Sequence, residues 1–192
     1  MARALLVIDV QNDFTEGGAL GVDGGAAVAS GISRYLGEHC GDYDLVVASR
    51  DWHDADNDNG GHFAAGRPDF VDTWPVHCVA GTRGADYHPD LATDAVDVHV
   101  KKGQGKPAYS IFEGTTEDGA ALAEVLAARG VTDVDVTGIA TDYCVRASAL
   151  DAAATGARVR VLTDLVAGVA PASSAAALEE LRAAGVEAVP SA

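Results

Sequence analysis

The sequence has few cysteines, and they are far apart. Cys40, Cys78 and Cys144 are the only three in 192 residues, and no two form a CxxC pair. An odd, widely spaced set indicates neither a disulfide framework nor a cysteine-based zinc site. Each cysteine therefore has to be judged by its own position in the chain.

Basic residues and long hydrophobic runs are also scarce. Thirteen Lys and Arg residues stand against 29 Asp and Glu residues, which gives a formal net charge of −16. Such a chain is poorly suited to bind nucleic acid or an anionic membrane. The apolar run in "MARALLVIDV" is interrupted by Asp9 and is too short for a signal peptide or a membrane span. We therefore expect a cytoplasmic protein.

What the sequence does contain is enough apolar residues for one core. Hydrophobic residues make up 48% of the chain, which suits a single domain over residues 1–192. Short apolar runs alternate with alanine-rich helical patterns, an order typical of an α/β fold with a parallel sheet and helices on both faces. The expected strands are Arg3–Val10, Asp44–Ser49, Val96–Lys101, Asp133–Thr137, Arg158–Leu162 and Val186–Val189. The expected helices are Ala26–His39, Glu117–Arg129, Asp142–Thr155 and Ser173–Ala184.

One long segment, at about residues 50–95, breaks this alternation. It is rich in Asp, Gly, His and Pro, and a loop of that length in a compact domain is usually functional or disordered. Asp51 and His53 are two residues apart, and His62 and His77 can fold back to join them. One carboxylate with two or three imidazoles suits Zn²⁺, Fe²⁺ or Mn²⁺, although Asp-rich loops with scattered histidines also occur without a metal.

Polar residues at strand ends are further candidates, because ligands bind beyond the carboxyl ends of parallel strands. Asp9 ends the first strand, where it is either a catalyst or a structural hydrogen-bond acceptor. In "VDVHVKKG" the alternation places Lys102 on the apolar face and Lys101 on the polar face. Two adjacent lysines usually lie at a solvated strand end. Here, however, the alternation of side chains along the strand indicates that Lys102 is the one that points toward a site.

Cys144 follows the fourth strand, in "GIATDYC", where a helix is expected to begin near Asp142. A free cysteine is most often a small packing residue. A position in the first helical turn instead offers unpaired N–H groups and the positive end of the helix dipole, which stabilise a thiolate. The same N–H groups could hold an oxyanion. Cys144 is therefore either a packing residue or a nucleophile.

Taken together, these segments closely resemble those of the nicotinamidases, also called pyrazinamidases, within the isochorismatase-like cysteine hydrolases. The similar segments run nearly end to end in family order: "DVQNDF", "GGAL", "RDWH", "GHF", "TWPVHC", "GTRGADYHP", "KKGQGKPAYSIFEG" and "GIATDYCVRASALDA". The segments "RDWH" and "WPVHC" point to nicotinamidase within the superfamily, because other branches generally lack that metal site.

The resemblance implies a Rossmann-like, doubly wound, six-stranded parallel sheet. It also implies hydrolysis of nicotinamide, and of pyrazinamide, to the acid and ammonia, as a step of NAD salvage. Asp9 would be the general acid/base, Lys102 would stabilise the charges of the triad, and Cys144 would attack the carboxamide to form a thioester. The backbone N–H groups of Ala140 and Cys144 would form the oxyanion hole, with a cis peptide bond before Ala140.

The resemblance further implies one divalent metal ion, Zn, Fe or Mn, that holds the pyridine nitrogen directly or through its bound water. Its ligands by motif are Asp51, His53 and His77, with His62 as the remaining candidate. The aromatic and apolar pocket positions are Phe14, Trp74, Tyr109, Ile139 and Tyr143. The partner would be a small-molecule substrate, and the chain a monomer or a small homo-oligomer.

Two other interpretations stay open. One is a different amidase, or an isochorismatase-type hydrolase, of the same superfamily, which would not need a metal. The other is a non-catalytic metal-binding or ligand-binding protein on the same fold. Against the second, Asp9, Lys102 and Cys144 are all present, and an enzyme that has lost its activity rarely keeps all three.

Overall fold

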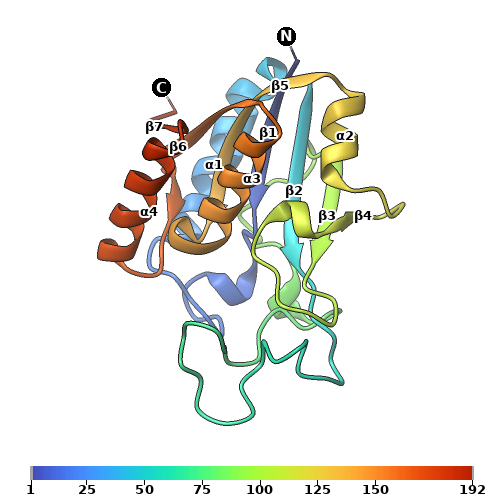
Figure 1. The fold of residues 1–192 in the computed structure, drawn as a ribbon, viewed down its shortest axis with the longest axis vertical. Coiled ribbons are helices and arrows are strands. Elements are labelled where there is room, and N and C mark those ends of the chain that lie inside the picture. Colours follow the sequence, from blue (N-terminus) through green and yellow to red (C-terminus); the bar gives the residue numbers. More distant parts are fainter. Residues whose placement is uncertain (1, 192) are drawn as a thin grey trace.

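In the computed structural model, which describes residues 2–191, the strands form one central sheet with helices on both faces (Figure 1). The strands are β1 (Ala2–Ile8), β2 (Leu45–Asp51), β3 (Val98–Lys102), β4 (Thr115–Thr116), β5 (Val131–Ile139), β6 (Arg158–Ala167) and β7 (Glu187–Val189). They lie in the order β4-β3-β2-β1-β5-β6-β7, and every neighbouring pair is parallel except β3 with β4. Without β4 this is the strand order of a doubly wound fold, which confirms the predicted fold class.

Within residues 2–191 the sheet has seven strands, one more than expected. The additional strand, β4, pairs antiparallel with the end of β3, Val100 facing Thr116 and Lys101 facing Thr115. A strand of two residues carries no alternation that a sequence pattern could reveal. The six expected strands are all present, and β2, β5 and β6 extend beyond the ends of their expected ranges.

Helices cover both faces because the central strands are apolar on both sides. The helices are α1 (Gly25–His39), α2 (Leu122–Ala128), α3 (Arg146–Ala154) and α4 (Pro171–Ala183). In β1, Leu5 and Val7 pack on the side of α1, whereas Leu6 and Ile8 pack with α2, α3 and α4 on the other side. All four side chains are fully buried, and each contributes about 1.5–3 kcal/mol relative to an exposed position.

Two helices begin several residues later than predicted. Helix α2 begins at Leu122 rather than Glu117, because the residues before it form a turn in which Thr116 bonds with Gly119 and Ala120. The helix expected from Asp142 begins instead as a π-helical turn, η5 (Thr141–Val145), which continues into α3. None of the helices within residues 2–191 combines the length and hydrophobicity that a membrane crossing requires.

The segment between β2 and β3 lies beneath the carboxyl ends of these strands (Figure 1). Its regular structure within the described chain is one short 3-10 turn, η3 (Arg83–Ala85), as expected for an irregular loop. Isolated bridges join His53 with Val79 and Phe63 with Trp74, so the loop folds back on itself. It therefore forms a layer of its own at the edge of the sheet.

Candidate active site

The ends of β1, β3 and β5 bring Asp9, Lys102 and Cys144 together. Asp9 and Lys102 are fully buried, and Cys144 is 7% exposed. The Lys102 Nζ lies 2.9 Å from Asp9 Oδ2 and 3.8 Å from Cys144 Sγ. Lys101 lies on the opposite side of β3, where its Nζ is 4.4 Å from the centroid of the Trp52 ring. The lysine that lies beside Asp9 and Cys144 is therefore Lys102, as the alternation in the sequence predicted.

Asp9 is held in place by a residue of β2 that the sequence analysis missed. The Ser49 Oγ donates to Asp9 Oδ1 at 2.6 Å and accepts from the Asp9 N–H at 3.2 Å. Asp9 has a φ of 48°, in the left-handed region where non-glycine residues are uncommon and are often found at functional sites. The available signal was a serine two positions before Asp51, on the same side of the strand.

Cys144 sits in η5, at the carboxyl end of β5. The peptide bond between Ile139 and Ala140 is cis, as the resemblance implied. The Ala140 carbonyl accepts from the N–H groups of Tyr143 and Val145, both at 3.1 Å. At Gly138, where φ is 113°, a Cβ would lie 2.1 Å from the Ile8 carbonyl oxygen. Only glycine therefore lets β5 approach β1 closely enough to deliver Cys144 beside Asp9.

The protonation state of Cys144 differs from the sequence expectation. Burial raises the pKa of its thiol well above the usual value, and the nearby carboxylates of Asp9 and Asp51 raise it further, while Lys102 only partly offsets them. Burial also raises the pKa of the Asp9 carboxyl, again with partial compensation by Lys102. The resting residue is thus a thiol beside a carboxylate that can accept its proton, rather than a thiolate stabilised by a helix end.

Asp51, at the end of β2, also pairs with Lys102, through its Oδ1. Burial alone would raise the pKa of Asp51, but Lys102 and the imidazoles of His53 and His77 outweigh it and hold the pKa well below the usual value. Burial likewise lowers the pKa of Lys102, but the carboxylates of Asp51 and Asp9 raise it well above the usual value. Two carboxylates thus share one ammonium ion, which leaves this part of the site one negative charge in excess.

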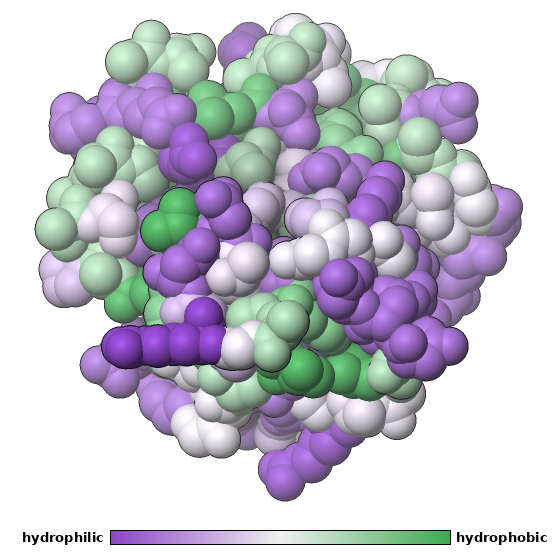
Figure 2. Space-filling view, turned by 60° about the horizontal axis from the view of Figure 1, so that its bottom comes forward, coloured by the Kyte–Doolittle hydropathy of each residue, from purple (hydrophilic) through white to green (hydrophobic). Residues whose placement is uncertain are grey.

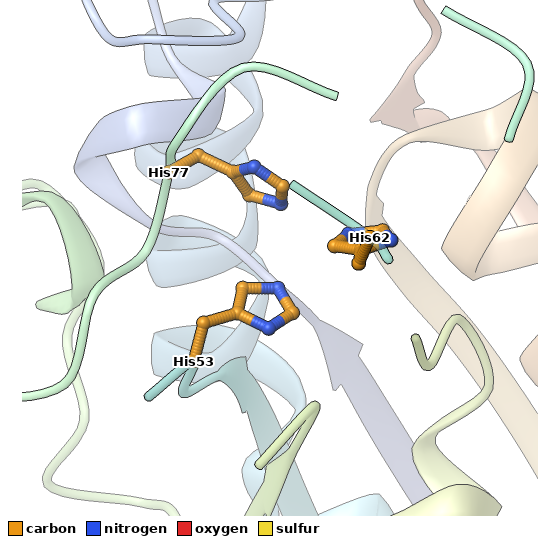
Figure 3. Close-up of side chains that lie close together, drawn as sticks. All are labelled: His53, His62 and His77. Atoms are coloured by element: carbon orange, nitrogen blue, oxygen red, sulfur yellow. The ribbon is translucent and has the colours of Figure 1, made fainter. Parts of the chain in front are cut away.

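Three histidines point toward one another, as Figure 3 shows. His53 follows β2, and His62 and His77 come from the loop, yet the candidate ligand atoms of the three rings all lie within 4.8 Å of one another. The Oδ2 of Asp51 is 3.6 Å from His53 Nε2 and 3.8 Å from His77 Nε2. The structure therefore brings together all four residues that the sequence suggested as metal ligands.

The orientation of the imidazoles fits a metal ion. The Nδ1 of His53 bonds to the Gly103 carbonyl at 2.8 Å, and that of His77 bonds to the Pro75 carbonyl at 2.7 Å. Both Nε2 atoms are thereby left as acceptors that face the cluster. The Nε2 of His53 and the Nδ1 of His62 are buried without a hydrogen-bond partner. Burial and the neighbouring histidines lower the pKa of His62 to about 4, so its ring is neutral at physiological pH.

A glycine allows this approach to His53. At Gly103, which directly follows β3 and has a φ of 84°, an added Cβ would lie 2.6 Å from the His53 ring. The loop after Lys102 can therefore accept the hydrogen bond from His53 only without a side chain at this position. Three imidazoles beside an excess carboxylate form a donor set for a divalent cation such as zinc.

A cavity of about 380 Å³ opens directly onto both groups of residues. Its lining includes Cys144, Asp51, His62 and His77, and most of the predicted pocket residues: Phe14, Trp74, Tyr109 and Tyr143. The Trp74 Nε1 donates to the Tyr109 hydroxyl at 2.9 Å, and the Tyr143 ring meets Trp74 edge-on with centroids 5.1 Å apart. Tyr143, for which the sequence offered no detailed role, thus forms part of the aromatic wall.

Ile139 does not line this cavity, contrary to the prediction. It is fully buried in the hydrophobic core on the α1 side of the sheet, together with Leu5 and Val7. As the last residue of β5, it alternates with Gly138, so its side chain points into the core.

The rim of the cavity includes Phe70 and Val169, which are 51% and 54% exposed. Figure 2 turns the carboxyl end of the sheet toward the viewer and shows a largely hydrophilic surface with separate apolar patches. The site thus combines the carboxyl of Asp9, the ammonium of Lys102 and the thiol of Cys144 with three imidazoles and an aromatic wall that suits a small flat ligand.

Comparison with known proteins agrees with this geometry. The family model described as the isochorismatase domain matches residues 3–192. The nicotinamidase/pyrazinamidase of Mycobacterium tuberculosis is 54% identical over 187 residues, covering 97% of this chain and 98% of that protein.

Solved structures agree as well. The pyrazinamidase of Pyrococcus horikoshii, solved in complex with zinc, has a TM-score of 0.83 at 40% identity and covers 99% of both chains. PnC1 from L. infantum, in complex with nicotinate, has a TM-score of 0.85 at 34% identity and covers 99% of this chain and 93% of that one. With the family match spanning nearly its whole length, the chain belongs to the isochorismatase family.

Proposed function

We propose that this protein is a nicotinamidase that hydrolyses nicotinamide to nicotinate and ammonia, that it also accepts pyrazinamide, and that it serves NAD salvage in the cytoplasm. The observation that carries the proposal is the meeting of Asp9, Lys102 and Cys144 at an aromatic cavity that also exposes His62 and His77. The 54% identity to a nicotinamidase/pyrazinamidase supports the same activity.

In the first half-reaction, Cys144 attacks the carboxamide carbon as its thiol proton passes to Asp9. The raised pKa of Asp9 makes it a better proton acceptor than an ordinary carboxylate. The negative charge that develops on the carboxamide oxygen is placed toward the backbone N–H groups of Ala140 and Cys144. Asp9 then returns the proton to the nitrogen, the carbon–nitrogen bond breaks, and ammonia leaves a thioester on Cys144.

In the second half-reaction, water attacks the thioester carbon while Asp9 takes one of its protons. The carbon–sulfur bond breaks, Asp9 reprotonates the departing Cys144 sulfur, and the acid leaves. Lys102 stays positively charged throughout because two carboxylates hold its pKa high. It therefore balances the charge as Asp9 and Cys144 exchange a proton.

We assign the metal site to His53, His62, His77 and Asp51, and propose zinc, which is also bound by the structurally similar pyrazinamidase. A metal bound there would supply a Lewis acid for the pyridine nitrogen, directly or through bound water. The chain itself positions the ring: Phe14, Trp74 and Tyr109 line the cavity with apolar surface. Since the substrate is neutral, the acidic surface of the protein does not repel it.

Ammonia release from nicotinamide, compared between the wild type and Cys144→Ala, tests the function. We expect the variant to lose at least about 10³-fold in kcat, because no other group replaces the nucleophile. Cys40→Ala is the matched control, since Cys40 is exposed and lies at the end of α1, outside the cavity lining. Equal rates for wild type and Cys144→Ala would overturn the proposal.

A further inference from the structure

Gln11 is a fully buried polar side chain that has no part in the mechanism above. Its Oε1 accepts from the Asp51 N–H at 2.8 Å, and its Nε2 donates to the Asp51 carbonyl at 2.9 Å. The same Nε2 also donates to the Ala85 carbonyl at 2.9 Å, in the loop. One side-chain amide therefore holds both backbone polar groups of Asp51 and ties them to the loop.

The register of the sheet explains why this bond pattern is needed. Val7 and Ala48 are the last neighbours in the β1–β2 pair, so Asp51 lies three residues beyond the last paired residue of β2. On its other side Asp51 still pairs with Lys102 of β3. The Gln11 amide takes the place of the missing peptide group of β1, and so satisfies backbone groups that would otherwise be buried and unpaired.

The position of the Asp51 backbone matters because its carboxylate contacts two parts of the site. Its Oδ1 pairs with Lys102, and its Oδ2 lies within 3.8 Å of the Nε2 atoms of His53 and His77. A rotation of the Asp51 backbone would move both carboxylate oxygens at once. It would therefore alter the ion pair with Lys102 and the donor set of the histidine cluster together.

We propose that Gln11 is a positioning residue that fixes the Asp51 carboxylate for metal binding. The inference rests on the proposed function in one respect, namely that Asp51 and the histidines bind a metal. Gln11 acts through the backbone of Asp51 and is not itself one of the residues that line the cavity. Such outer partners of metal ligands are worth about 10–100-fold in metal affinity.

The test is the zinc affinity of the metal-free protein, measured by competition with a chromophoric chelator. Gln11→Met keeps the length of the side chain and removes the amide, and we expect zinc to bind about 10–100-fold more weakly. Gln11→Glu keeps the shape and the acceptor for the Asp51 N–H but loses both donated hydrogen bonds. It is also expected to bind zinc more weakly, and it carries the test if the methionine variant does not fold.

Ser49→Ala is the matched control. It removes an equally buried hydrogen bond at the end of the same strand, but one that holds Asp9 rather than Asp51. We expect its zinc affinity to stay close to that of the wild type, whatever it does to catalysis. A general loss of packing would weaken zinc binding in Ser49→Ala as much as in the Gln11 variants, and that result would overturn the proposal.

Two further outcomes would overturn it: wild-type zinc affinity in the Gln11 variants, or no zinc binding by the wild type. Because zinc binding is measured without nicotinamide, the result is separate from the activity test. If Cys144→Ala released ammonia as fast as the wild type, the proposed nicotinamidase function would fail. A weaker zinc affinity in the Gln11 variants would still support the role of Gln11.

Discussion

The site has two halves that are built in different ways. Asp9, Lys102 and Cys144 follow or end strands β1, β3 and β5, whose register is fixed by parallel pairing. His62 and His77 instead come from an irregular loop, whose shape depends on side-chain hydrogen bonds. Fully buried Asn59, for example, accepts from the N–H groups of Asp54 and Gly105 through its Oδ1.

The two halves also differ in the interactions that their side chains make. In the strand half, a charged ammonium lies between two buried carboxylates, so removal of Lys102 would leave two buried charges without a counter-ion. In the loop half, the imidazole nitrogens lie close enough together to hold a metal ion. Asp51 belongs to both halves, which makes it the point where they are coupled.

Among the substitutions that separate the two halves, Lys102→Met, which breaks the strand half, is expected to have the largest effect. Two buried carboxylates would lose their counter-ion, so we expect the chelator-treated protein to lose about 3–5 kcal/mol of unfolding free energy. Ammonia release should fall by at least about 10²-fold, since the charge of the triad is no longer balanced. Urea unfolding and the nicotinamide assay measure the two effects.

Lys101→Met is its control, because Lys101 is adjacent in sequence and lies over Trp52 on the other side of β3. We expect it to lose at most about 1 kcal/mol and to keep its activity. Equal effects of Lys102→Met and Lys101→Met would show that the face of β3 on which a lysine lies does not determine its contribution to stability and activity.

An intermediate effect is expected from His62→Ala, which breaks the loop half. It removes a ring with a buried, unpartnered Nδ1, so we expect zinc affinity and kcat/KM to fall by at least about 10-fold. Chelation of the wild type should reduce the same activity, and added zinc should restore it. In His88→Ala, whose ring lies outside the cluster, the activity should be unchanged. Full activity of His62→Ala after chelation would show that the loop half does not contribute to the reaction.

The smallest effect is expected from Asp69→Ala, at the rim of the loop half. The Asp69 Oδ1 accepts from the N–H groups of Val71, Asp72 and Thr73, and so shapes the turn that presents Phe70 to the cavity. We expect KM for nicotinamide to rise by less than about tenfold with kcat unchanged. Steady-state kinetics measure this, and a fall in kcat with unchanged KM would contradict it.

The same carboxylate gives a pH dependence for this turn. Hydrogen bonds from the N–H groups of Val71, Thr73 and Asp72 hold the pKa of Asp69 below its usual value. The contribution of the carboxylate to the turn is therefore fully present at neutral pH and is lost only as the pH falls through that lowered pKa.

Much of the strand half could be predicted from local patterns. Alternation in "VDVHVKKG" is enough to separate Lys102 from Lys101, because successive side chains in a strand point to opposite faces. The supporting residues could not be found this way. Gln11 and Ser49 act through hydrogen bonds to residues 40 positions away, and no local pattern reveals such partners.

The sequence by itself determined the order of strands and helices, the residues that stand at the carboxyl ends of the strands, and the composition of the loop. These features follow from periodicity and spacing, which are local properties of the chain. Only the tertiary structure decided which charged side chains lie close enough to pair. It buried Asp9, Asp51 and Lys102 together, raised the pKa of the Cys144 thiol, and turned Ile139 into the core. The reason is that desolvation and charge pairing depend on distances across the fold, which no single segment contains.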